Sequence, residues 1–430
     1  MKTTWAAIIT GLIFACSLFP ALISAQPRPV TDSSMTRATF RFHEDNLSAC
    51  HRVKAPKVHI EHAADRGESL LGIDLWQGEC RFALSLCDQG AGPQIGPNNM
   101  RHVGDTVTLG SDRVKYRLYA LSGMALEWEV VLANPPDTNC LEFPLEASGL
   151  RFYCQPPLSD SEIALGCYRP DSVVGSWAAY HASRSGRRVT VGAGGDISLV
   201  EDYGCGKAFH IYRPKAWDSS GDTVWCKLHL EDDRLTLTMP QQFLDRAVYP
   251  VTIDPEIGFS GVGASYRTVL DYGQANVDPD YTYVATTGDR VTGFYAHTKV
   301  YSGTKTCEAA VYTMPGDSLN GGQRPDTAVF ISISSTDYAW NSVTGLSQSL
   351  ASGTRYAMAL GNTSGTINIS YDASVVPDNT SYAADNQSLM TTWVETGRAD
   401  HRLSMYALVE NTGGGDDETN RRRSLLTGER

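Results

Sequence analysis

The chain has 430 residues, of which 42% are hydrophobic and 20% are charged, so it is long enough for two globular domains and too apolar for wholesale disorder. Its formal net charge at pH 7 is −12. Nucleic-acid binding and attachment to an anionic membrane surface both need a basic patch, and this charge balance argues against both.

The first 25 residues have the pattern of a secretory signal peptide. Lys2 is followed by an uncharged run, residues 3–25, that ends on the small residue Ala25. We expect cleavage after Ala25 and a protein that is secreted or held at the cell surface. Two alternatives stay open: the run could remain in the bilayer as an anchor, or a lipid could be attached at Cys16. No later run has spanning length, so no membrane association is expected once the signal is removed.

A polar leader, residues 26–56, precedes a first β domain that we place at residues 57–255. Residues 79–86 alternate apolar and polar side chains, which is the period of a half-buried strand. Gly-Ser and Ser-Gly signals separate further short apolar runs and predict an antiparallel meander. Its expected strands cover residues 103–109, 114–121 and 126–132. One segment, residues 172–183, lacks this pattern and is predicted to hold a short helix.

The clearest hairpin covers residues 226–239, with its turn at Asp232-Asp233. Folding there places leucines opposite leucines and a glutamate opposite an arginine, so both apolar contacts and charge specify the register. The expected pairs are Leu230 with Leu235, Leu228 with Leu237, and Glu231 with Arg234.

Eight cysteines lie between the expected signal peptide and residue 256, and in an exported chain an even set predicts disulfides. Cys140 and Cys154 flank Ala147 symmetrically, which predicts a hairpin with these two residues opposed and bonded. The other partners stay open among Cys50, Cys80, Cys87, Cys167, Cys205 and Cys226. Zinc is the alternative, but no Cys-x-x-Cys pair occurs. We expect the ninth, Cys307, to be a buried free thiol.

Residues 244–255 mark the expected seam between two domains. Pro250 and Pro255 bracket a strand-like run, and a proline cannot donate to a sheet ladder. We therefore predict a last strand between the two prolines, followed by a stiff exit from the first domain.

Residues 256–410 are predicted to form a second domain, a β-sandwich of jelly-roll type. Short strand patterns alternate with Gly-containing turns, and no long helical period is present. The expected strands cover residues 290–300, 306–313, 328–333, 355–360, 366–371 and 402–409. A charged, flexible tail follows at residues 411–430. The predicted fold is thus all-β, with a disulfide-braced antiparallel domain followed by the sandwich.

Two short segments resemble parts of known extracellular proteins. Tyr249-Pro250-Val251-Thr252-Ile253-Asp254-Pro255 resembles the segment that closes a β-rich region in many secreted or wall-associated bacterial proteins, including those with Rhs-type repeats. Trp340, followed by residues 350–360, is similar to a Trp … Leu-x-x-Gly-Thr-x-Tyr pattern of extracellular β-sandwich modules. The resemblance implies architecture and an exterior location, and it implies no catalytic residue.

Aromatic residues near predicted strand ends are the candidate ligand contacts, because flat rings with a polar edge can stack on sugar faces. The candidates are Tyr281, Tyr283, Tyr338, Trp340 and Trp393, with packing in the core as the alternative for each. Asp271, Asp278 and Asp280 lie in an oxygen-rich loop that suits calcium, with turn formation as the alternative. No other cofactor is expected.

Motifs for catalysis are weak. The Gly-x-Ser-x-Gly turn of serine hydrolases does not occur, and no phosphate-binding loop is found. Glu127 and Glu129 share one strand face and are the acid pair considered for glycoside hydrolysis, with a solvated strand face as the alternative.

We therefore predict a non-catalytic secreted or cell-surface protein that binds a glycan or a protein partner through residues 256–410. A secreted glycoside hydrolase or lyase, and a structural component of a surface layer or fibre, are the alternatives.

Overall fold

The computed structural model describes residues 30–31, 37–41, 51–52, 56–63, 68–86, 100–103, 105–121, 124–164, 166–192, 194–231, 233–269, 273–277, 282–362, 365–373, 380–383 and 389–412. These residues form four β-sheets and three short helical segments, which confirms the all-β prediction. The helical segments are η1 (Trp76–Gly78), α1 (Asp160–Ala164) and α2 (Gln241–Leu244). None of the helices in the described ranges is long and apolar enough to cross a membrane.

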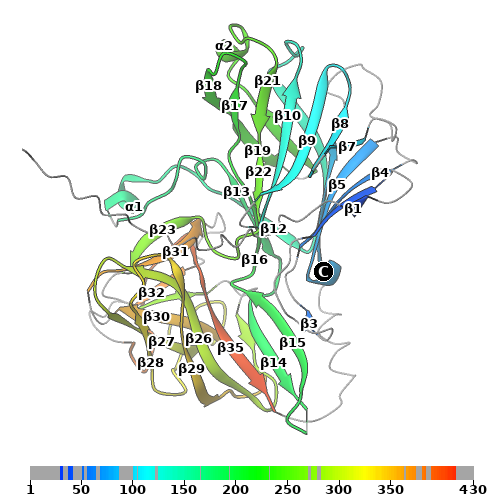
Figure 1. Ribbon diagram of the computed structural model, residues 1–430. Coiled ribbons are helices and arrows are strands. Elements are labelled where there is room, and N and C mark those ends of the chain that lie inside the picture. The colour runs from blue at the N-terminus through cyan, green and yellow to red at the C-terminus, as the bar shows by residue number, and fades with distance from the viewer. Residues whose placement is uncertain are drawn as a thin grey trace, which may run out of the picture.

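Two sheets form the first sandwich (Figure 1). The first sheet has the order β1 (Val30–Thr31), β2 (Arg37–Arg41), β4 (Lys57–Ala63), β5 (Glu68–Leu75), β6 (Cys80–Leu86), β11 (Cys140–Ser148), β20 (Arg234–Thr238) and β19 (Lys227–Glu231). The second sheet has the order β12 (Leu150–Cys154), β13 (Trp177–His181), β16 (Lys207–Ile211), β22 (Glu256–Gly258), β10 (Ala125–Leu132), β21 (Val251–Asp254), β17 (Lys215–Trp217) and β18 (Thr223–Trp225), and it extends from β10 through β9 (Val114–Leu121), β8 (Thr106–Gly110) and β7 (Arg101–Val103).

One apolar core lies between these two sheets. The Phe82 ring of the first sheet meets Phe209 of the second with 5.2 Å between ring centroids, and Trp128 meets Phe143 at the same separation. Alternation in sequence produces these faces: in β9, residues Val114, Tyr116 and Leu118 are buried while the residues between them are not.

The second sandwich also has two sheets. The third sheet has the order β23 (Ser265–Val269), β31 (Ile367–Ala373), β26 (Asp289–Val300), β35 (Met405–Asn411), β14 (Gly186–Val191), β15 (Ile197–Gly204) and β3 (His51–Arg52), with β29 (Ala339–Ser349) on β26 and β34 (His401–Leu403) on β31. The fourth has the order β28 (Val329–Ile333), β27 (Lys305–Thr313), β30 (Arg355–Asn362), β24 (Gln274–Asn276), β32 (Thr380–Ala383) and β33 (Glu395–Ala399), with β25 (Tyr283–Val284) on β30.

The third sheet includes strands from the first half of the chain. β14 pairs in parallel with β35, with Arg187 opposite Leu408, and β15 pairs with β14. Figure 1 shows β14 and β15 beside β35 in the lower body. The sheets therefore do not follow the linear boundary at residue 255, because residues 186–204 complete a sheet built mostly from residues after it.

The exit expected at Pro255 is wrong, although the strand predicted before it is present as β21. β22 follows Pro255 directly, and both strands pair with β10. The ladder continues because proline lacks only a donor: the Pro255 carbonyl still accepts a hydrogen bond from the Trp128 backbone N–H at 3.2 Å.

The helix predicted within residues 172–183 is also wrong. Residues 177–181 form β13, which pairs with β12 on one side and β16 on the other. Its residues 178–181 are all buried, and a short apolar run buried on both faces has no period that separates strand from helix.

The hairpin of residues 226–239 is confirmed in detail. Leu230 lies opposite Leu235, Leu228 opposite Leu237, and Glu231 opposite Arg234. The strands expected in the second half are also present, within one or two residues at most ends, except that residues 402–409 are divided between β34 and β35. Six strands described after residue 260 were not predicted: β23, β24, β25, β29, β32 and β33.

Candidate functional site

A continuous row of aromatic rings crosses the third sheet, and we call it the aromatic strip. It contains six aromatic residues and one histidine, each ring next to the following one. The centroid separations along it are Tyr168 to Tyr266 6.4 Å, Tyr266 to Tyr338 4.2 Å, Tyr338 to His297 5.9 Å, His297 to Trp340 5.4 Å, Trp340 to Tyr406 5.1 Å, and Tyr406 to Tyr295 4.9 Å. Such separations are those of stacked and edge-to-face aromatic pairs.

Strand alternation and register place these rings on one face. On β26, Tyr295 and His297 point away from the core, while Phe294 and Ala296, which alternate with them, are buried. The register sets Tyr406 opposite Tyr295, and Trp340 opposite His297, on the two neighbouring strands. Directly opposed side chains on one sheet face are close enough for ring contact.

The strip is open to solvent at several points. Tyr168 is 60% exposed and Trp340 is 39% exposed, whereas the other rings are half-buried. Large aromatic side chains are usually buried, so a row of accessible rings marks a surface suited to binding.

The histidine of the strip adds no charge near neutral pH. Burial lowers the pKa of His297 to about 4, and its Nδ1 lies 2.7 Å from the Ser370 hydroxyl. The strip is therefore a row of neutral rings over most of its length.

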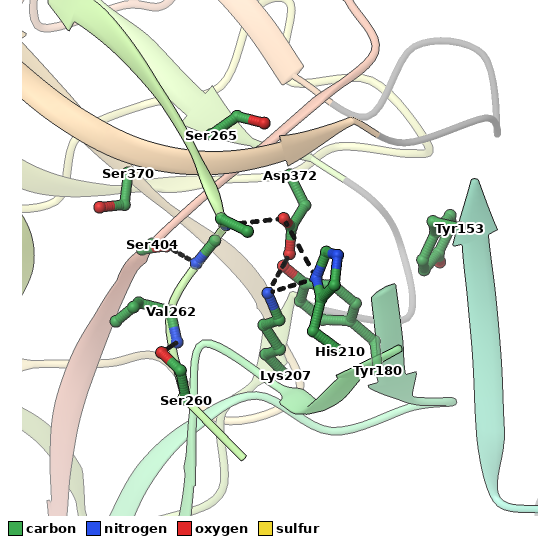
Figure 2. Close-up of polar contacts among 12 residues, drawn as sticks. Tyr153, Tyr180, Lys207, His210, Ser260, Val262, Ser265, Ser370, Asp372 and Ser404 are labelled. Atoms are coloured by element: carbon green, nitrogen blue, oxygen red, sulfur yellow. Dashed lines mark hydrogen bonds and ion pairs between the residues drawn. The ribbon is translucent and has the colours of Figure 1, made fainter. Parts of the chain in front are cut away.

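A buried polar cluster joins the two sandwiches (Figure 2). Asp372 of β31 receives hydrogen bonds from Lys207 Nζ, the Tyr180 hydroxyl and the Ala264 N–H, each at 2.8 Å. The Lys207 and Asp372 side chains are fully buried. Burial by itself would raise the pKa of Asp372, but Lys207, His210 and the Ala264 N–H outweigh it and hold that pKa below its ordinary value.

The cluster contains a serine, a histidine and an aspartate, but its hydrogen bonds run in the wrong direction for a nucleophilic serine. The Ser176 hydroxyl donates its single proton to the Val173 carbonyl at 2.6 Å, so His210 Nε2, 2.6 Å away, must be the donor to Ser176. His210 Nδ1 then accepts from Lys207 at 3.1 Å. His210 has no free acceptor for the serine proton, and we assign the cluster a structural role.

The structure distributes the predicted aromatic residues among different environments. Tyr338 and Trp340 lie in the aromatic strip. Trp393 is 1% exposed and packs against Tyr312 in a core cluster, so the prediction of a ligand contact is wrong for this residue. Tyr283 packs against the core of the second sandwich, and its hydroxyl donates to Asp289. Tyr281 lies outside the described residues.

Sequence reasoning missed five members of the strip. They are Tyr168, Tyr266, Tyr295, His297 and Tyr406. The alternation in residues 290–300 places Tyr295 and His297 on one face and was the one available signal. The contact partners of that face depend on strand pairing, which the alternation does not disclose.

No disulfide is formed among the cysteines that the structure describes, so the predicted Cys140–Cys154 bond is wrong. β11 pairs with β20 and β6, whereas β12 pairs with β13, so the predicted hairpin is wrong. Cys140 Sγ instead lies 3.2 Å from the Thr238 hydroxyl. The described cysteines without a disulfide are Cys80, Cys140, Cys154, Cys167, Cys205, Cys226 and Cys307, of which Cys307 is buried as predicted; Cys50 and Cys87 lie outside the described residues.

No metal centre is seen in the described ranges, where no group of three or more His, Cys, Asp or Glu side chains could hold an ion. The calcium candidates Asp271, Asp278 and Asp280 lie outside these ranges, and that prediction stays a prediction.

The acid pair considered for glycoside hydrolysis is buried, so the alternative of a solvated strand face is wrong. Glu127 is 5% exposed and Glu129 is 8% exposed. Glu129 is paired with the Arg117 guanidinium at 2.6 Å and accepts a hydrogen bond from the Tyr119 hydroxyl at 3.0 Å. These partners give Glu129 a structural role.

Comparisons with known proteins add little to this geometry. No protein-family model matches the chain, and no curated protein sequence matches it. Among solved structures, the exo-β-1,3-galactanase of Phanerochaete chrysosporium with galactose covers 89% of this chain and 94% of its own, at 10% identity and a TM-score of 0.15. Similarity at that level carries no conclusion about fold or function.

Proposed function

We propose that the protein binds a glycan through the aromatic strip of the third sheet. The observation that supports this proposal is the unbroken row of rings from Tyr168 to Tyr295 on one accessible sheet face. A sugar ring presents a face of C–H groups with partial positive charge, and this face complements the negative face of an aromatic ring. A row of rings offers several such contacts to successive sugars of one chain.

Binding fits the strip better than catalysis does. The rings are neutral, and the Lys207–Asp372 cluster is fully buried with its groups committed to one another. We further propose, from the export pattern of residues 1–25, that binding takes place outside the cell.

Retention on a panel of immobilised polysaccharides tests this proposal. Trp340→Ala removes the most exposed indole of the strip, and we expect at least tenfold weaker binding, about 1.4 kcal/mol. Phe330→Ala is the matched control, because Phe330 is 54% exposed but lies on β28 in the fourth sheet.

Equal retention of Trp340→Ala and the unmodified protein would refute a role for the strip. Release of soluble sugars from a bound polysaccharide would instead favour the hydrolase or lyase alternative, and the same panel reports that outcome.

A further inference from the structure

A cation lies over two rings, one of them Tyr338 of the aromatic strip. Lys299 lies on the same face of β26 as Tyr295 and His297. Its Nζ is 4.7 Å from the ring centroid of Tyr338 and 5.5 Å from that of Tyr301. Both separations are within the range of cation–π attraction, so the two rings hold the ammonium group at the surface.

The charge of Lys299 has no acidic partner in the part of the chain that the structure describes. No carboxylate there forms an ion pair with it, whereas Arg187, whose charge acts on Tyr406 of the strip, is paired with Asp202 at 3.5 Å. The whole chain has a net charge of −12, so an unpaired lysine on the proposed binding face is a local exception.

Hydrogen-bond donors accompany this cation. The Asn368 amide donates to the Tyr301 hydroxyl at 3.1 Å. Because Tyr301 accepts through its oxygen, its own O–H stays available to a ligand, and the residue is 65% exposed. The region around Tyr338 thus combines flat rings, an ammonium group and a phenolic donor.

We propose that the glycan bound by the strip is acidic, with a carboxylate or sulfate group placed on Lys299. This inference rests on the proposed glycan-binding function and names its ligand class. The ring face of the sugar packs on Tyr338 and Trp340, while an anionic group at its edge accepts hydrogen bonds from Lys299 Nζ and the Tyr301 hydroxyl. Charge-assisted hydrogen bonds of this kind are stronger than neutral ones.

The test compares acidic polysaccharides with neutral counterparts of the same backbone. The full-length protein is titrated with polygalacturonate, alginate, hyaluronan and chondroitin sulfate, and with the methyl-esterified or desulfated form of each. We expect the affinity for at least one acidic polymer to exceed the affinity for its neutral form by about tenfold or more. The carboxylate and sulfate members distinguish the two anion sources.

Substitution of Lys299 assigns that difference to one residue. Lys299→Met keeps an unbranched side chain on the rings without its charge, and it should bring the acidic form down to the affinity of the neutral form. Lys299→Arg should retain most of the preference. Lys227→Met is the matched control for loss of one positive charge, because Lys227 is exposed on β19 in the first sheet.

The outcomes separate this inference from the proposed function. Trp340-dependent binding with no preference for any acidic form would overturn the acidic-ligand proposal and leave glycan binding intact. The acidic-ligand proposal would also be overturned if Lys299→Met weakened binding to the acidic polymer and to its neutral form equally. Absence of Trp340-dependent binding to every polymer would remove the proposed function itself.

Discussion

At the scale of single residues, the Lys207–Asp372 pair is a fully buried ion pair between the sandwiches. Both side chains are fully buried, and the carboxylate accepts three hydrogen bonds of 2.8 Å. Taking both charges out of water has a desolvation cost, which offsets much of their attraction. Removal of one partner, however, leaves the other charge buried without compensation and strongly lowers the stability of the fold.

Asp372→Asn is therefore expected to lower the free energy of unfolding by about 3–5 kcal/mol, because the Lys207 ammonium stays buried without its counter-charge. Urea denaturation measures the change. Asp317→Asn is the matched control, since Asp317 is paired with Arg355 at 3.3 Å but its side chain is 87% exposed. There the loss should stay below about 1 kcal/mol. Equal losses at both sites would contradict this assignment.

His210 predicts how stability depends on pH. Burial, together with the Lys207 charge, lowers the pKa of His210 from 6.5 to about 3, although Asp372 opposes the shift. Between pH 6.5 and 3 the unfolded chain binds a proton at this histidine and the folded protein does not. Stability should therefore fall as the pH falls through that window, by about 1.4 kcal/mol per pH unit for this group.

Chemical denaturation between pH 7 and 4 checks this slope. His210→Gln should reduce the slope of stability against pH by the contribution of about one proton, about 1.4 kcal/mol per pH unit, whatever its effect on absolute stability. His229→Gln, at an exposed position on β19, is the control for loss of an imidazole. An unchanged slope in His210→Gln would show that this histidine does not couple folding to protonation.

At the scale of elements, the turn between β11 and β12 decides which strands pair. Gly149 has φ of +69°, and a Cβ there would lie 2.1 Å from the Glu79 carbonyl oxygen. The Gly149 carbonyl accepts hydrogen bonds from the Ala182 N–H at 2.8 Å and from Cys80 Sγ at 3.0 Å. The turn thus passes the chain from the first sheet to the second, where a hairpin would have kept both strands in one sheet.

Gly149→Ala should accordingly lower the free energy of unfolding by more than the strain of its backbone conformation alone would. Gly303 provides the matched control, because its φ is +67° and no atom lies within 4 Å of an added Cβ. We expect about 1 kcal/mol for Gly303→Ala, from left-handed strain, and a clearly larger loss for Gly149→Ala. Thermal unfolding of the two variants measures the difference, and similar values would contradict the close approach at Gly149.

At the scale of the whole molecule, contacts across the junction connect the two sandwiches. The Gln155 side chain exchanges two hydrogen bonds with the Ala373 backbone, at 2.8 and 3.0 Å. The Arg402 guanidinium lies 4.6 Å from the Tyr153 ring centroid and 4.3 Å from that of Tyr180. Together with the Lys207–Asp372 pair, these contacts join the two sandwiches. The chain also leaves the first sandwich after β13, adds β14 and β15 to the third sheet, and returns to the second sheet at β16.

We expect the protein to unfold in one cooperative transition for this reason. Differential scanning calorimetry should give one peak whose calorimetric and van't Hoff enthalpies agree. Asp372→Asn should lower the transition temperature, because it weakens the junction. Two resolved transitions in the unmodified protein would show that the sandwiches fold independently.

Local patterns predicted much of the fold. The register of residues 226–239 could be read because leucines and opposite charges specify it within one hairpin. Most strands of the second half could likewise be placed from alternation and turn residues. Of the binding site, Tyr338 and Trp340 were found, because their residue type and their place near strand ends suggest exposure.

The sequence by itself determined the fold class and the positions of most strands, since period-2 alternation and turn chemistry act over a few neighbouring residues. Only the tertiary structure decided which strands pair, whether the described cysteines are bonded to one another, and which rings form the aromatic strip. β14 pairs with a strand more than 200 residues later, and Tyr168 meets Tyr266 across the junction. Such contacts depend on the packing of distant segments, which no local pattern encodes.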